Sequence, residues 1–303
     1  MDLYGTAKVP VDMSMFASSH SNRPPSAVLD HQNDSYKYIN VPIIGRVRCI
    51  KDKNGMISLL CVYLYWLYGT FTTLFIVLIP AYNDGLISSI LIYFFLAIAF
   101  LCLSSLIRAS TMNPGTIPAE SQIQALVDDS WTYCNICQRK RPFRAHHCRR
   151  CRQCVAKMDH HCPWINNCVG EANHYAFALL LLYAFMFGLL SFILSMLHFW
   201  VLPRCISCDR EVFYIKHSIW FMYILTALGL NMFLVMGLQL FGTHFNLLID
   251  RTTLQNLQGT PEDGITIRST LTAYKELFGR NAILCWLLPC RRRKSNNYDL
   301  HQI

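Results

Sequence analysis

The chain has 303 residues, of which 53% are hydrophobic and only 15% are charged, and its formal net charge is +9. This composition excludes an ordinary soluble globular protein and is typical of a small polytopic membrane protein. The positive charge favours an acidic partner, namely nucleic acid, a membrane surface or an anionic cofactor.

Four apolar runs follow an N-terminal segment that is rich in Ser, Asn, Pro and Asp, which we expect to be mostly disordered. Each run is long enough to cross a hydrocarbon core of ~30 Å, and only helices satisfy their own backbone in lipid. The runs cover residues 57–82, 86–107, 175–202 and 218–241. We therefore predict an all-α polytopic membrane protein with four transmembrane helices and a cysteine-rich domain between the second and the third.

The predicted organisation has five parts. They are a cytosolic N-terminal region (1–55), helices 1 and 2 (56–107), the cysteine-rich domain (108–174), helices 3 and 4 (175–241) and a cytosolic C-terminal region (242–303). Lys and Arg are frequent in the first, third and fifth parts and absent from the turn at 83–85, which makes those parts cytosolic. The loop between helices 3 and 4 carries Arg204, Arg210 and Lys216, so the rule is weaker there.

The stretch from Cys134 to Cys168 contains seven cysteines and four histidines. Pairs separated by two residues, such as Cys134 and Cys137, have the spacing at which two thiolates reach one tetrahedral zinc ion. Two four-ligand sites would use eight of these eleven residues, and the spacing does not say which eight. If both sites were of the Cys3His type, one cysteine would remain as a candidate nucleophile.

The candidate nucleophile is Cys162, which follows Asp159 and His160 in the sequence Asp-His-His-Cys. A histidine can accept the thiol proton, and a carboxylate can hold that imidazole in one orientation. The alternative is that all seven cysteines bind metal or that Cys162 is an inert thiol.

The whole stretch resembles the cysteine-rich domain of the DHHC protein S-acyltransferases, the palmitoyltransferases, and the match continues from Pro163 to Gly170. The resemblance implies Cys162 as nucleophile, His160 as base and Asp159 as the residue that orients it. It also implies two structural zinc ions, whose ligands are Cys134, Cys137, His147 and Cys154 for one and Cys148, Cys151, His161 and Cys168 for the other.

The chain departs from the family pattern at three positions outside this stretch. Asn113 replaces the aspartate of an Asp-Pro-Gly turn, Gln255 replaces the glutamate of a Thr-Thr-x-Glu motif, and Ala273 stands where an asparagine is usual. The threonines of that motif help to tie the segment to the catalytic module. The change at Gln255 puts the ionic part of the tie in doubt but leaves the hydroxyl part.

The resemblance predicts a protein S-palmitoyltransferase that takes a long-chain acyl group from acyl-CoA and passes it to cysteines of substrate proteins. We expect Arg141 and His146 to bind the CoA phosphates, Trp164 to lie at the membrane interface, and Phe187 to cap the acyl tunnel at about thirteen helical residues, or ~20 Å, from its mouth. The alternative for each of the four is an ordinary surface or packing role.

Two rival functions remain on the sequence alone. One is a catalytically silent zinc-containing membrane scaffold or adaptor, and the other is an ion transporter, against which the few polar residues within the spans argue. The expected partners are membrane lipids and proteins with membrane-proximal cysteines, with no nucleic acid. The predicted location is the Golgi or plasma membrane rather than the endoplasmic reticulum, with the active site at the cytosolic face. Cys205 and Cys208 could form a disulfide or a third metal half-site, and Cys285 and Cys290 could themselves be acylated.

Overall fold

The computed structural model describes residues 36–41, 45–117, 131–201, 219–259, 267–279 and 283–289. Cys205, Cys208, Cys290 and the basic run at 291–294 lie outside these residues.

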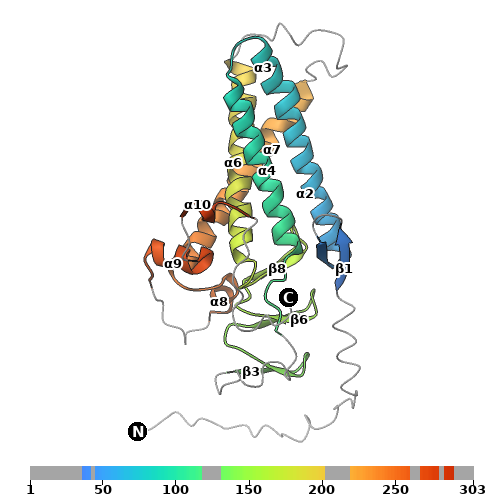
Figure 1. Cartoon of the computed structure of the whole chain (residues 1–303), viewed down its shortest axis with the longest axis vertical. Helices are drawn as coiled ribbons and strands as arrows, with labels where there is room; N and C mark the ends of the chain where they lie inside the picture. Colours follow the sequence, from blue (N-terminus) through green and yellow to red (C-terminus); the bar gives the residue numbers. More distant parts are fainter. Residues whose placement is uncertain are drawn as a thin grey trace, which may run out of the picture.

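Four long helical segments stand side by side, and the cysteine-rich domain lies at one end of them (Figure 1). The four predicted spans are confirmed. The first consists of three consecutive pieces, in which a π-helical turn precedes Pro80, a residue without a backbone N–H. The segments are α2 (Lys53–Thr72) with η2 (Thr73–Leu78) and α3 (Ile79–Asn83), then α4 (Ser89–Thr111), α6 (His174–Trp200) and α7 (Ile219–Leu248). The fourth helix continues past the predicted end at residue 241, because helical hydrogen bonding persists beyond the apolar run.

Helix α6 is the most buried of the four and packs against both α4 and α7. Glycines make the contact between α6 and α7 close. A Cβ atom on Gly188 would lie 2.7 Å from the backbone nitrogen of Phe233, and one on Gly229 would lie 2.9 Å from that of Phe192. Small residues of this kind allow helix backbones to approach each other in a membrane.

The cysteine-rich domain consists of three short antiparallel hairpins. Their strands are β3 (Thr132–Cys134) with β4 (Arg139–Arg141), β5 (His146–Cys148) with β6 (Gln153–Val155), and β7 (His160–Cys162) with β8 (Asn167–Val169). The side-chain amide of Asn167 fixes the last hairpin to the end of α4, because it donates to the carbonyl oxygens of Ala109 (3.1 Å), Ser110 (3.3 Å) and Met112 (2.8 Å). Carbonyl oxygens at a helix end have no intrahelical donor, and that of Ala109 also accepts from Asn173 at 3.4 Å.

Another hairpin precedes the first span, and sequence analysis did not predict it. Strands β1 (Tyr36–Val41) and β2 (Gly45–Ile50) pair antiparallel, with Tyr36 opposite Ile50. After α7, the residues that the structure describes form three shorter helices: α8 (Thr253–Gln258), α9 (Thr270–Phe278) and α10 (Ile283–Trp286). In Figure 1 α8 lies beside the cysteine-rich domain.

Candidate active site and metal centres

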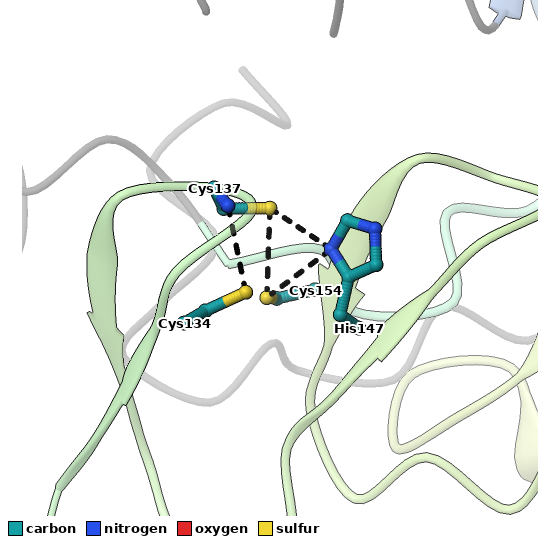
Figure 2. Close-up of side chains that lie close together, drawn as sticks. All are labelled: Cys134, Cys137, His147 and Cys154. Carbon is teal, nitrogen blue, oxygen red and sulfur yellow. Dashed lines mark hydrogen bonds between the residues drawn. The ribbon is translucent and has the colours of Figure 1, made fainter. Parts of the chain in front are cut away.

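The first metal centre is formed by Cys134, Cys137, His147 and Cys154, whose ligand atoms all lie within 4.8 Å of one another. Figure 2 shows the three sulfur atoms and the imidazole pointing toward one centre. The Nδ1 atom of His147 is 3.1 Å from the sulfur of Cys137. The hydrogen bond from Cys154 lowers the pKa of Cys137 and raises that of Cys154, so Cys137 is the thiol of this pair that ionises first.

The second centre is formed by Cys148, Cys151, His161 and Cys168, again with all ligand atoms within 4.8 Å. The sulfur atoms of Cys168 and Cys151 are 3.4 Å apart, and the Nδ1 atom of His161 is 3.4 Å from Cys151. Both clusters offer three buried thiols and one imidazole, a set that suits a closed tetrahedral zinc site. The structure thus brings together the two groups of residues that the resemblance implies.

The alternation of side chains along β7 separates metal binding from the candidate nucleophile. His161 pairs with Cys168 across the hairpin and faces the second metal centre. Because successive residues of a strand point to opposite faces, His160 and Cys162 lie on the other face. Cys162 is accordingly packed in the same apolar cluster as residues of α6, and the ring of His160 contacts Phe177 edge-on at 5.4 Å.

Asp159, His160 and Cys162 form a chain of polar contacts. The Nδ1 atom of His160 is 2.8 Å from Oδ2 of Asp159, and His160 also makes a side-chain hydrogen bond with Cys162. Burial lowers the pKa of His160, but the hydrogen bond and charge of Asp159, together with Cys162, outweigh it and raise the pKa to about 9. This shift favours transfer of a proton onto His160.

Asp159 is itself held by the segment that follows α7. Thr253 donates its backbone N–H to Oδ1 of Asp159 (2.6 Å) and its hydroxyl to Oδ2 (2.9 Å). Burial raises the pKa of Asp159, but hydrogen bonds from His160 and Thr253 and the positive charge of His174 lower it to about 2. Asp159 is therefore ionised throughout the physiological range, and the expected hydroxyl tie from the Thr-Thr segment is present.

An apolar cavity of about 380 Å³ opens between α2, α4, α6 and α7, and Cys162 lies in its wall. Trp164, which is 37% exposed, lines the same cavity next to Cys162. On α6 the lining residues run from Phe177 to Ala184. An apolar chain attached to the sulfur of Cys162 would therefore extend between the helices.

Phe187 lies one helical turn beyond Ala184 but does not line this cavity; it lines a smaller one of about 10 Å³. The smaller cavity is lined by Gly69, Ser191 and Phe187 itself, among others. The Phe187 ring is buried and stacks on Phe95 with a centroid distance of 5.6 Å.

Arg141 and His146 lie close to each other but do not line the cavity. They lie on β4 and β5, and the charge of Arg141 adds to burial in lowering the pKa of His146. The Nε atom of Arg141 donates to Oγ1 of Thr132 at 3.2 Å. Neither residue lines the cavity that contains Cys162.

The amides at two of the three departures make local hydrogen bonds. Oδ1 of Asn113 accepts the backbone N–H of Gly115 (3.0 Å) and of Thr116 (2.9 Å), which closes the turn after α4. Gln255 accepts the backbone N–H of Thr252 at 2.9 Å and forms a capping box at the start of α8. Ala273 is buried and lines a polar pocket of about 90 Å³.

Sequence reasoning assigned no role to Asn167 or Asn173, which position the β7–β8 hairpin that carries Cys162, here called the catalytic hairpin after its candidate nucleophile. Asn173 donates to the carbonyl oxygen of Cys168 at 2.8 Å and accepts from the backbone of Gly170 at 2.9 Å. An Asn directly before an apolar run is a helix-start signal. Nothing in the sequence indicates the additional hydrogen bonds from the Asn173 side chain to the end of the β7–β8 hairpin.

Comparison with known proteins agrees with this geometry. A family described as DHHC palmitoyltransferase matches residues 127–260. The chain is 32% identical over 257 residues to the palmitoyltransferase ZDHHC21 of Bos taurus, a match that covers 84% of this chain and 97% of that protein. It is 32% identical over 257 residues to ZDHHC21 of Homo sapiens, with the same coverage, and 30% identical over 276 residues to ZDHHC3 of Rattus norvegicus, covering 86% and 88%.

Proposed function

Because the chain belongs to the DHHC palmitoyltransferase family and is a protein-cysteine S-acyltransferase, we propose that Cys162 carries the acyl group between acyl-CoA and the substrate protein. One observation supports this assignment above the others. The sulfur of Cys162 borders the apolar cavity, while the same side chain contacts a histidine that is held by an ionised carboxylate.

In the first step His160 accepts the proton of the Cys162 thiol, and the thiolate attacks the carbonyl carbon of the acyl-CoA thioester. A bond forms between this carbon and the sulfur of Cys162, and the bond to the sulfur of CoA breaks. The leaving CoA thiolate takes the proton back from His160. Asp159 holds the Nδ1 atom of His160 in a hydrogen bond, so that Nε2 is the nitrogen available to Cys162.

In the second step a cysteine thiol of the substrate protein gives its proton to His160 and attacks the acyl thioester on Cys162. The acyl group moves to the substrate sulfur, and the Cys162 sulfur regains the proton. The two Cys3His clusters hold structural zinc in this proposal, since four protein ligands leave no open position for a substrate.

The acyl chain lies in the cavity between the helices, where burial contributes about 0.8 kcal/mol per CH2 group. Phe187 closes the far end and favours chains of about fourteen to sixteen carbons, in keeping with the ~1.5 Å rise per helical residue between the mouth and Phe187. Trp164 borders the mouth, and Arg141 with His146 provides cationic and hydrogen-bonding groups for CoA phosphates on the aqueous side.

The substrates in this proposal are proteins with membrane-proximal cysteines, because Cys162 lies where the cysteine-rich domain meets the helix bundle. The protein is an integral membrane protein with four candidate spans. We propose that its active site faces the cytosol and that it works at the Golgi or the plasma membrane.

The deciding experiment is acyl-enzyme formation in the detergent-purified protein with an alkyne-tagged palmitoyl-CoA. Wild type should acquire a label that hydroxylamine removes, and Cys162→Ser should not. Cys285→Ser is the matched control, because Cys285 is a partly exposed thiol outside the catalytic hairpin, and it should label like wild type. Equal labelling of Cys162→Ser and wild type would move the chemistry to another cysteine, and an unlabelled but zinc-loaded wild type would favour the scaffold function.

A further inference from the structure

A buried arginine lies on the hairpin that packs against the second cluster of metal-binding residues. Arg48, on strand β2, is 4% exposed, and among the described residues neither of its Nη atoms has a hydrogen-bond partner. Its guanidinium lies over the ring of Tyr36, 4.6 Å from the centroid. An unpaired buried charge is costly, so this arrangement calls for a counter-charge nearby.

The second cysteine cluster, which packs against the same hairpin, is one source of negative charge. Burial lowers the pKa of Arg48, and nearby Cys151, two tyrosines and Cys168 counteract that shift. Ile50 and Tyr36 of the same hairpin pack into one buried cluster with Cys148, Cys151 and Cys168. Three thiolates and a neutral imidazole around Zn²⁺ leave one net negative charge, which the guanidinium of Arg48 would balance.

A second charged side chain, that of Asp52, lies on the same face of this segment as Arg48. Arg48, Ile50 and Asp52 alternate along an extended segment, so their side chains share a face. Oδ2 of Asp52 lies 3.8 Å from Nε2 of His161, whereas Nδ1 of that imidazole faces the thiols. The Nδ2 atom of Asn166 also donates to the carbonyl oxygen of Ile50 at 3.0 Å, which joins this segment to the turn of the catalytic hairpin.

We propose that the segment from Arg48 to Asp52 is the outer shell of the second zinc site, with Arg48 as a positioning residue that neutralises its thiolates and Asp52 as the carboxylate that orients His161. Outer-shell groups of this kind fix the ligands of metal sites and change metal affinity when they are removed. Since His161 and Cys168 stand opposite each other next to Cys162, the segment before the first span thereby holds the catalytic hairpin in place. This inference rests on the metal site and not on acyl transfer.

The test measures how fast each cysteine becomes alkylated by N-ethylmaleimide in the presence of a zinc chelator. Full-length protein in detergent carries Cys162→Ser, and tandem mass spectrometry resolves the cysteines of the two clusters. The variants are Arg48→Met, which keeps the length and removes the charge, and Arg48→Lys, which keeps the charge. Arg149→Met is the matched control, because Arg149 lies between two ligands of the same site and is exposed.

In Arg48→Met we expect Cys148, Cys151 and Cys168 to react roughly 10-fold to 100-fold faster than in the parent protein, with the first cluster unchanged. Arg48→Lys should restore most of the protection, and Arg149→Met should behave like the parent. If Arg48 had no counter-charge, replacing it with an apolar side chain would be neutral or stabilising. Undiminished protection of the second cluster in Arg48→Met would therefore overturn the proposal.

A general folding defect gives a different result, in which both clusters of Arg48→Met become reactive together. Arg48→Lys then decides: parent-like protection of both clusters supports a requirement for positive charge, and equal exposure of both contradicts it. Because every protein in this comparison lacks the Cys162 thiol, failure of the outer-shell proposal is distinguishable from failure of the acyl-transfer mechanism.

Discussion

Shortening Phe187 to alanine should change which acyl chains the enzyme accepts. The Phe187 ring lies on α6 beyond the cavity that borders Cys162 and lines the smaller cavity near Ser191. From Phe187 to Ser191 the helix rises about 6 Å at ~1.5 Å per residue, which is enough for the two additional CH2 groups of a stearoyl chain. At about 0.8 kcal/mol per CH2 these contribute up to about 1.6 kcal/mol, or a shift of about 15-fold toward stearoyl over palmitoyl.

The assay is competition between equimolar palmitoyl-CoA and stearoyl-CoA, with the acyl-enzyme ratio read by intact-protein mass spectrometry. Phe185→Ala is the matched control: it removes an equal ring from the same helix, where the ring packs on Phe233 away from the main cavity. Losing a buried phenylalanine costs about 3–5 kcal/mol of stability, so thermal unfolding is measured in parallel. An unchanged ratio in a folded, active Phe187→Ala protein would refute the role of Phe187 as a cap.

Three further predictions concern the groups around the catalytic hairpin. Asp159→Asn should lower the rate of acyl-enzyme formation by roughly 100-fold or more while both zinc ions stay bound, because the carboxylate charge that orients His160 is lost. A matching loss of zinc, measured by metal analysis, would indicate a structural role instead. Thr253→Val removes the hydroxyl bond to Asp159, worth about 1.5–3 kcal/mol to a charged group, together with the bond that this hydroxyl accepts from Asn246. It should slow the reaction about tenfold, whereas Thr253→Ser should restore it. A Val variant with the wild-type rate would argue against the tie. Asn167→Ala should destabilise the protein by about 1–3 kcal/mol in thermal unfolding, since the carbonyls of Ser110 and Met112 lose this donor, and an unchanged Tm would contradict that assignment.

Hydropathy and cysteine spacing were sufficient to predict the spans and the dense cluster of metal-binding residues. Apolar length determines what can cross a bilayer, and closely spaced thiols such as Cys134 and Cys137 meet at one point through local turns. Spacing alone left the partition of the ligands open, and the resemblance supplied it. The structure brings those same groups together.

Contacts between distant segments were beyond sequence reasoning, because nothing local encodes them. Thr253 is 94 residues from Asp159, and the Asn166 amide reaches a carbonyl oxygen 116 residues earlier in the chain. The hairpin before the first span was missed for the same reason, since its buried face packs against cysteines far along the sequence. At Asn113 and Gln255 an amide oxygen accepts backbone N–H groups, so the turn and the helix cap both form with an amide at these positions.

The two hydrogen bonds from Thr253 to Asp159 also have a consequence for biogenesis. During synthesis the metal-binding hairpins and Cys162 leave the ribosome well before Thr253, which follows the fourth span. A nascent chain whose fourth candidate span has not yet been inserted therefore contains the candidate nucleophile and its histidine but not the group that holds the carboxylate. Assembly of the site thus depends on synthesis of this span, and a chain that stalls before it lacks the hydrogen bonds from Thr253.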